Sequence, residues 1–195
     1  MNKINRDSVM TLEAYAKIRQ KFRAQVMTHK KSRKIYLGSN ILIIFEDELT
    51  VRYQIQEMLR VEKMFEEKEI LEEINVCNLL IPDGSNLKAT MMIEYPDPKE
   101  RAVRLVKLVG VENKVWLRIA EHESVYAIAD EDLGREREEK TSAVHFLRFE
   151  FTREMIQALR NGANMSIGID HPSYPALIST VDAAIRNSII NDFTV

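Results

Sequence analysis

The sequence predicts an α+β protein, and three observations support this prediction. Apolar residues three and four positions apart indicate helices in the N-terminal third of the chain. Further along, short segments alternate between apolar and polar residues, and turns rich in Gly and Pro separate them. Alternation is typical of antiparallel strands with one buried face. We therefore expect a mostly antiparallel sheet of about six strands, packed against N-terminal, central and C-terminal helices.

Composition limits the class of protein. The 195 residues are 45% hydrophobic and 30% charged, which is typical of one globular domain over residues 1–195. The net charge of −2 argues against a generally basic nucleic-acid binder. Cys77 is the only cysteine, which excludes an intrachain disulfide. The first residues resemble no signal peptide, and no apolar stretch approaches the ~20 residues of a membrane span, so we expect a cytoplasmic protein.

The first predicted helix starts after Thr11, a favourable N-cap residue, and runs to about Thr28. A helical projection places Arg19 and Arg23 on its apolar face. Two arginines one turn apart on such a face indicate either an internal ion pair with carboxylates or long side chains that extend to water.

Charge is distributed unevenly along the chain. Residues 14–45 contain eight Lys or Arg residues and no Asp or Glu, so this segment carries +8 and the remainder −10. Such a segment could form an anion site or a docking surface for an acidic partner, but the favoured interpretation of its cluster at residues 30–34 is a solvated basic helix end. Nucleic-acid binding is not expected, because no aromatic residues for base stacking accompany the cluster at residues 30–34.

The stretch Phe45 to Met64 is predicted to be the centre of the fold. A hairpin precedes it, with strands at 35–37 and 41–45 joined by a turn at 38–40. In the helix that follows, Glu62 projects into the apolar stripe, while Gln54 and Glu57 lie beside it. These polar residues either pair or escape to solvent, or else line a pocket. The predicted core positions are Val51, Ile55, Met58 and Leu59, and the predicted solvent positions are Arg52, Gln56 and Lys63.

The rest of the chain continues the α+β pattern. Asp130 to Lys140 is interpreted as a solvated, charge-rich loop, and Asp170 to Pro175 as a rigid turn. The predicted elements are a helix at 66–77, strands at 87–95, a helix at 99–109, strands at 114–120, 124–129 and 141–151, a helix at 152–160, a strand at 165–170 and a closing helix from 176 to about 191.

The residues that most often perform chemistry form no known motif. The sequence has no Gly-rich nucleotide loop, no G-x-S-x-G and no H-E-x-x-H. His145 falls on the apolar face of its strand, where a histidine is more often a hydrogen-bonded core residue than a ligand. Cys77 falls on the inner face of a helix, which favours a structural role over a nucleophilic one. The histidines lack the spacing of metal ligands, so no metal site is predicted.

Several segments resemble a bacterial family of about this length that is known only as a domain of unknown function. The similar segments are YAKIRQKFRAQVMTHKKSRKIYLG, FEDELTVRYQIQEMLRVE, NLLIPDGSNLKATMMIE, KTSAVHFLRFEF and IDHPSY, which together span nearly the whole chain. Family members are often encoded beside rubrerythrin-like proteins and iron–sulfur proteins related to heterodisulfide reductase. The resemblance therefore implies a link to peroxide handling or iron-dependent redox chemistry. The chain departs from the family at Cys77, where we expect an aromatic residue, so the resemblance gives this cysteine no catalytic role.

Two functions remain open at this point, and the sequence does not decide whether the protein is an enzyme. The first is a non-catalytic accessory protein that docks on an acidic or iron–sulfur redox protein. The second is an enzyme or small-molecule-binding protein with a polar pocket on the central helix. For such a pocket we expect Arg19 and Arg23 to face Gln54, Glu57 and Glu62 across a helix contact, with His145 or His171 close by. Cofactor and oligomeric state are left open. The full candidate binding set is Arg19, Arg23, Gln54, Glu57, Arg60, Glu62, His145, Asp170, His171 and Tyr174.

Overall fold

The computed structural model describes residues 3–129 and 141–194, and the predicted loop at 130–140 lies outside them. Six α-helices occur in this part of the chain. The longest, α1, begins after Thr11, whose hydroxyl accepts the N–H of Ala14 as the predicted N-cap. The helices are α1 (Leu12–Lys31), α2 (Glu48–Val61), α3 (Glu67–Cys77), α4 (Pro98–Lys107), α5 (Arg153–Arg160) and α6 (Ala183–Ile190), with short 3₁₀ turns at Arg6–Ser8, Asn78–Leu80 and Val111–Lys114.

The strands of the described residues form two antiparallel sheets. One sheet has the order β1-β2-β3-β7-β6, and the other has the order β5-β4-β8-β9. The strands are β1 (Lys34–Leu37), β2 (Ile41–Phe45), β3 (Asn86–Ile93), β4 (Val115–Ile119), β5 (Val125–Tyr126), β6 (Ile128–Ala129), β7 (Val144–Glu150), β8 (Met165–His171) and β9 (Tyr174–Ile178).

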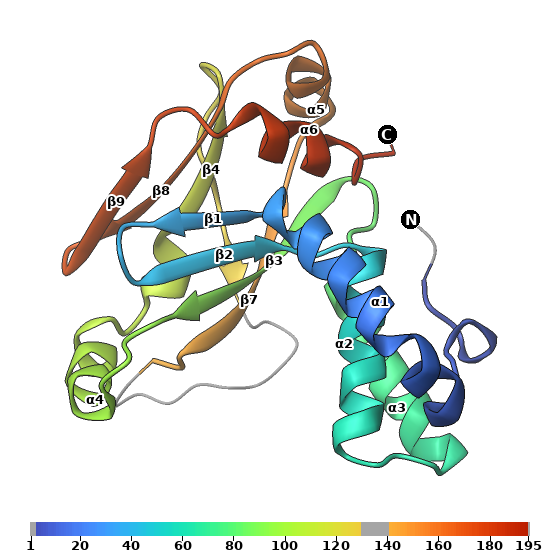
Figure 1. The fold of residues 1–195 in the computed structure, drawn as a ribbon. Coiled ribbons are helices and arrows are strands. Elements are labelled where there is room, and N and C mark those ends of the chain that lie inside the picture. Colours follow the sequence, from blue (N-terminus) through green and yellow to red (C-terminus); the bar gives the residue numbers. More distant parts are fainter. Residues whose placement is uncertain (1–2, 130–140, 195) are drawn as a thin grey trace.

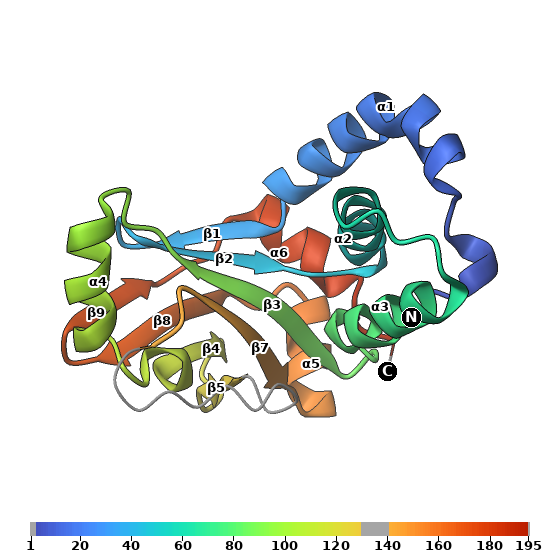
Figure 2. The ribbon, with the colours of Figure 1, turned by 90° about the horizontal axis from the view of Figure 1, so that it is seen from below.

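The main core lies between these two sheets, which Figures 1 and 2 show as two layers of a sandwich. Alternate residues of each strand face inward, as the period of two in a strand requires. The inward residues of the central strands are Ile41, Ile43, Phe45, Leu87, Ala89, Met91 and Ile93 from the first sheet, and Val115, Leu117, Ile119, Met165, Ile167 and Ile169 from the second.

Both sides and both ends of the sandwich are closed. On one side, β5 pairs with β4 and β6 with β7, so a single chain segment joins the two sheets. On the other side, the Tyr174 hydroxyl of β9 donates to the carbonyl oxygen of Leu37 in β1, at 2.8 Å. Helix α4 covers one end through Leu105 and Leu108, while α5 and α6 cover the other (Figure 1).

A second core lies beside the sandwich among α2, α3 and the segment before α1, and α1 adds to it only the partly buried Leu12 (Figure 2). It is lined by Val51, Ile55 and Leu59 of α2, which are the predicted core positions apart from Met58. Met58 is 36% exposed. Gln56 contradicts its predicted solvent position, because it is fully buried and its side-chain oxygen accepts the N–H of Met10 at 2.8 Å.

The α+β class and the antiparallel pairing are confirmed, and the strands divide between two sheets instead of one of about six strands. The predicted closing helix from residue 176 is wrong at its start. Residues 174–178 form β9, which pairs with β8 around Pro172 and Ser173, and α6 begins only after Asp182, whose side chain accepts the N–H of Ala184. Tyr174, Ala176 and Ile178 follow the period of two of a strand, and the helical period begins only after them. Because both patterns consist of apolar residues, the sequence did not show where the strand ends and the helix begins.

Candidate functional site

The predicted site residues lie in three separate places. Arg19, Glu57 and Arg60 meet between α1 and α2. His145 is in the sandwich core on β7, and the residues of the Asp170–Tyr174 segment are at the β8–β9 turn. Figure 1 shows the β8–β9 turn and the three-helix layer at opposite sides of the molecule. The prediction that a histidine lies close to the arginines is therefore wrong, because the strand of His145 does not run beneath α1 and α2.

Glu57 is the centre of the first cluster. The guanidinium of Arg19 donates to both carboxylate oxygens, at 2.7 and 2.8 Å, and the hydroxyl of buried Tyr15 donates at 2.7 Å. Arg60, one turn along α2, adds a contact of 3.3 Å. These hydrogen bonds, with that from Arg19 first, lower the pKa of Glu57 to about 2. The predicted contact between Arg19 and Glu57 is present, and its carboxylate is saturated by donors of the protein itself.

The other predicted members of this cluster do not join it. Arg23 is exposed, and none of the ion pairs found within the described residues involves it. Gln54 turns toward α3, where its amide lies 3.9 Å from the sulfur of Cys77. Glu62 is exposed at the C-cap of α2, so it escapes to solvent as a residue at a helix end can.

His145 has the structural role that its position favours. It is 5% exposed, and its Nε2 lies 2.8 Å from the Thr141 hydroxyl and 3.0 Å from the Ser142 carbonyl oxygen. Glu112 is 3.8 Å away. Burial among these partners fixes the ring in the core.

An ionic cluster that the sequence did not reveal surrounds the buried side chain of Arg33. This side chain is 1% exposed, and it donates to the carbonyl oxygens of Phe45 and Glu46 and to the carboxylate of Asp192. Asp47 lies 3.4 Å from the guanidinium, and His29 is 2.5 Å from Asp47. The interpretation of residues 30–34 as a solvated helix end is thus wrong for Arg33, because the chain leaves the helix there and enters β1 under the C-terminal segment.

The two carboxylates around Arg33 respond differently to burial. Burial alone would raise the pKa of Asp47, but Arg33, the N–H of Thr50 and His29 together lower it. Burial raises the pKa of Asp192 to about 6, because its share of the single guanidinium compensates only part of the desolvation. Asp47 could have been found from the sequence as a capping residue, since Asp47 and Thr50 form a capping box. Asp192 carries no such local signal.

The Asp170–Tyr174 segment separates into an outward and an inward part. Asp170 accepts a hydrogen bond from the Tyr126 hydroxyl at 2.6 Å, and Tyr126 and then Trp116 lower its pKa. His171 lies beneath the turn, where Nε2 donates to the Val109 carbonyl oxygen at 3.2 Å and Nδ1 accepts the N–H of Ser173. Both nitrogens of His171 are therefore engaged in shaping the turn.

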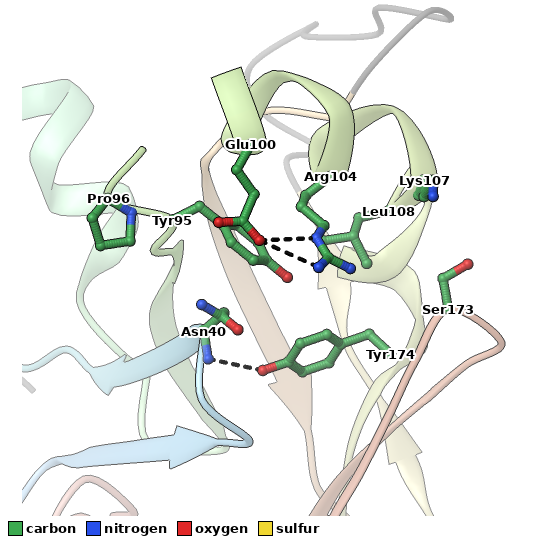
Figure 3. Close-up of a pocket in the computed structure, with 9 residues that line it drawn as sticks. All are labelled: Asn40, Tyr95, Pro96, Glu100, Arg104, Lys107, Leu108, Ser173 and Tyr174. Carbon is green, nitrogen blue, oxygen red and sulfur yellow. Dashed lines mark hydrogen bonds and ion pairs between the residues drawn. The ribbon is translucent and has the colours of Figure 1, made fainter. Parts of the chain in front are cut away.

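Tyr174, the last residue of this segment, lines a pocket at the α4 end of the sandwich (Figure 3). Its hydroxyl accepts the N–H of Asn40 at 2.9 Å and donates to Leu37, so the β1–β2 turn is bound to β9. Gly38 permits this approach, because a Cβ there would lie 2.6 Å from the hydroxyl and the backbone has a φ of +64°. The pocket has a volume of about 270 Å³ and is lined by Asn40, Tyr95, Pro96, Glu100, Arg104, Lys107, Leu108, Ser173 and Tyr174.

The described residues offer neither a reactive thiol nor a metal cluster. Cys77 is 2% exposed, and burial together with Glu73, which accepts from the sulfur at 3.1 Å, raises the pKa of its thiol. Among residues 3–129 and 141–194, no three His, Cys, Asp or Glu side chains are grouped as metal ligands. The helices in these two ranges are also too short or too polar to cross a lipid bilayer.

Comparisons with known proteins show where the chain belongs. A crystal structure described as a novel protein of unknown function from Burkholderia pseudomallei K96243 is 49% identical, with a TM-score of 0.95 over 99% of this chain and 100% of that one. No curated protein sequence matches the chain. Residues 3–193 match the family described as "Protein of unknown function (DUF3501)". The chain therefore belongs to the DUF3501 family, as its resemblance to a family of unknown function predicted.

Proposed function

We propose that this protein is a non-catalytic accessory protein that docks on an acidic partner through the outer face of α1. The observation that carries the proposal is the poor burial of this helix. Only Tyr15 and Val26 of its 20 residues are buried, although the helix is about 30 Å long by the rise of 1.5 Å per residue. In Figure 2, α1 lies on the outside of the helical layer, away from the sheets.

The exposed face of α1 is basic and is not neutralised along the helix. After Glu13 the helix contains no acidic residue, and Lys21, Arg23 and Lys31 are exposed. The short exposed side chains of Ala24 and Thr28 fall between Lys21 and Lys31 in the helical projection. A long basic face of this kind attracts an acidic surface and accelerates association with it.

Apolar side chains beside this face give a partner more than charge to bind. Ile18 of α1 is 42% exposed, and on the neighbouring α2 Met58 and Val61 are 36% and 58% exposed. Interfaces commonly combine an apolar centre with a charged rim, so the helical layer supports docking better than the ion-paired residues around Glu57 support catalysis. Those residues are already occupied by one another.

The partner that the family resemblance implies is an iron–sulfur or rubrerythrin-like redox protein. This part of the proposal rests on the gene neighbourhood of the family. An acidic redox partner is compatible with the basic face of α1. From the gene neighbourhood we infer a role in iron-dependent redox chemistry or peroxide stress.

The proposal is tested by affinity capture from the native host with three forms of the chain. The first is wild type, and the second reverses three charges on α1 (Lys21→Glu, Arg23→Glu and Lys31→Glu). The third is a control that reverses three exposed charges elsewhere (Lys99→Glu, Arg101→Glu and Arg153→Glu). Captured proteins are identified by mass spectrometry, and their iron content and their release by added salt are measured.

The expected result is an acidic, iron-containing protein that wild type and the control both retain and that the α1 variant loses. Its release should require less salt as α1 loses charge, because screening weakens exposed charge pairs. Capture of the same proteins by all three forms would contradict docking through α1. Capture of an acidic protein without iron would keep α1 as the surface and would remove the redox partner from the proposal.

A further inference from the structure

The pocket beside α4 has an excess of positive charge that its own residues do not neutralise. Arg104 contacts Glu100 at 3.3 Å, and Lys107 follows one turn later on the same helix. No described residue pairs with Lys107. With two cations and one carboxylate among the lining residues, one positive charge is left over. A pocket with this balance favours an anion.

A tyrosine hydroxyl without a described partner points into the same space. Tyr95 is only 7% exposed, yet its hydroxyl hydrogen bonds to none of the described residues, and Figure 3 shows it directed between α4 and Tyr174. Burial raises its pKa, so the group stays protonated and can donate. This hydroxyl is not one of the fully buried polar atoms of the described residues, so it is accessible from the pocket and can donate to a ligand oxygen.

The walls of the pocket are held in place before any ligand binds. The Tyr174 ring is fixed through the two hydrogen bonds of its hydroxyl, and Arg104 is placed over the Tyr95 ring, at 5.7 Å from its centroid. His171 supports the turn that carries Ser173. A site whose walls are already ordered loses less conformational entropy on binding.

We propose that this pocket binds the oxyanion group of a small organic acid, a phosphate or a carboxylate, through Arg104, Lys107 and the Tyr95 hydroxyl. The Ser173 hydroxyl and the Asn40 amide lie at the rim for further hydrogen bonds. The body of the ligand lies against the Tyr174 ring and Leu108. The volume of about 270 Å³ is slightly below the usual range for ligand pockets, which restricts the ligand to a small molecule.

This inference is independent of docking through α1, because the two surfaces share no residue. It also assigns a role to the Asp170–Pro175 segment, which builds one wall of the pocket through Ser173 and Tyr174. This pocket lies on α4 and the β8–β9 turn, away from the central helix on which the sequence predicted a polar pocket.

Titration calorimetry of the full chain near pH 7 and low salt tests the proposal with phenyl phosphate, benzoate and neutral benzyl alcohol. At least one anion should bind with a Kd below about 1 mM, and benzyl alcohol should bind at least about tenfold more weakly. Tighter binding of phenyl phosphate assigns a phosphate ligand, and tighter binding of benzoate assigns a carboxylate. Failure of both anions to bind at about 10 mM, or equal binding of benzyl alcohol, would overturn the inference.

Variants locate the binding in the pocket. Lys107→Met and Arg104→Met should each weaken the anion by about tenfold or more, and Tyr95→Phe by about threefold or more, since it removes only the hydroxyl. The matched control Lys99→Met, which changes an exposed lysine of the same helix outside the pocket, should stay within about twofold. Equal losses in the control and in Lys107→Met would overturn the assignment, as would unchanged affinity in all the pocket variants. Because Lys107 is exposed, its variant should fold normally, which circular dichroism checks, and the α1 charge-reversal form should bind the anion like wild type.

Discussion

Arg19 and Arg33 come from the same acid-free segment of the chain, and both bind carboxylates, but they differ in burial. The side chain of Arg19 is 35% exposed, while that of Arg33 is 1% exposed. Arg19 has one main partner on the adjacent helix, whereas Arg33 joins the end of β2, the start of α2 and the residues after α6. An ion pair near water can exchange its partner for solvent, but a buried one cannot.

The presence of an ion pair alone therefore does not indicate how much a charged residue contributes to the stability of the fold. The Arg19 cluster connects two helices that also share an apolar contact surface, so its loss leaves other contacts in place. The Arg33 cluster connects the helical layer with the C-terminal segment. We therefore expect the effects of substitution to follow burial, and four predictions test this order.

Replacing Arg33 should have the largest effect. Arg33→Met removes the guanidinium from Asp47 and Asp192 and leaves both carboxylates buried, which should lower the free energy of unfolding by about 3–5 kcal/mol. Guanidinium chloride unfolding at pH 7 measures the change. Arg33→Met combined with Asp192→Asn should recover part of the loss, because one buried charge disappears with its partner. A loss below about 1 kcal/mol for the single variant would show that the cluster is open to water.

Replacing Glu57 should have a smaller effect. Glu57→Gln keeps the shape of the side chain but removes the charge that accepts from Arg19 and Tyr15. We expect a loss of about 1–2 kcal/mol, because both Glu57 and Arg19 are partly exposed and water screens the pair. Tyr15→Phe should cost less and should combine non-additively with Glu57→Gln in a double-mutant cycle. Strictly additive losses would argue against the hydrogen bond between them.

The sequence predicted the contact between Arg19 and Glu57 but not the cluster around Arg33, for a physical reason. Helical periodicity places Arg19 and Glu57 beside the apolar stripes of two helices, so their meeting follows from the packing of those stripes. Arg33 lies two residues beyond the end of α1, and its partner Asp192 is 159 positions away. No local pattern encodes such a distance, and the same is true of the pocket, where Tyr95 and Tyr174 meet only because the two sheets close along β1 and β9.

The pH dependence of stability should reveal the buried cluster directly. The pKa of Asp192 is raised from 3.8 to about 6, so the native state binds a proton more readily than the unfolded chain between these two values. This residue therefore adds stability as the pH falls from 7 toward 4, and the gain is lost again as the pH rises through 6. Relative to Asp192→Asn, wild type should gain about 1 kcal/mol between pH 7 and pH 5 in denaturant unfolding. A difference that does not change with pH, or that changes in the opposite sense, would show that Asp192 stays ionised in the fold.

The smallest effect is expected for Arg23, which lies in the same segment as Arg19 and Arg33. The helical projection places Arg23 on the same apolar face as Arg19, and only the structure separates them, because Arg23 is exposed while Arg19 contacts Glu57. Arg23→Gln should therefore change the free energy of unfolding by no more than about 0.5 kcal/mol, as surface substitutions usually do. Thermal unfolding beside Arg19→Gln, which removes the two hydrogen bonds to Glu57 and should cost more than Arg23→Gln, provides the measurement. Equal losses for the two variants would mean that the projected helix face, and not the observed contact, sets the contribution of each arginine. If instead Arg23→Gln leaves stability intact and weakens partner capture, the residue belongs to the docking face of α1.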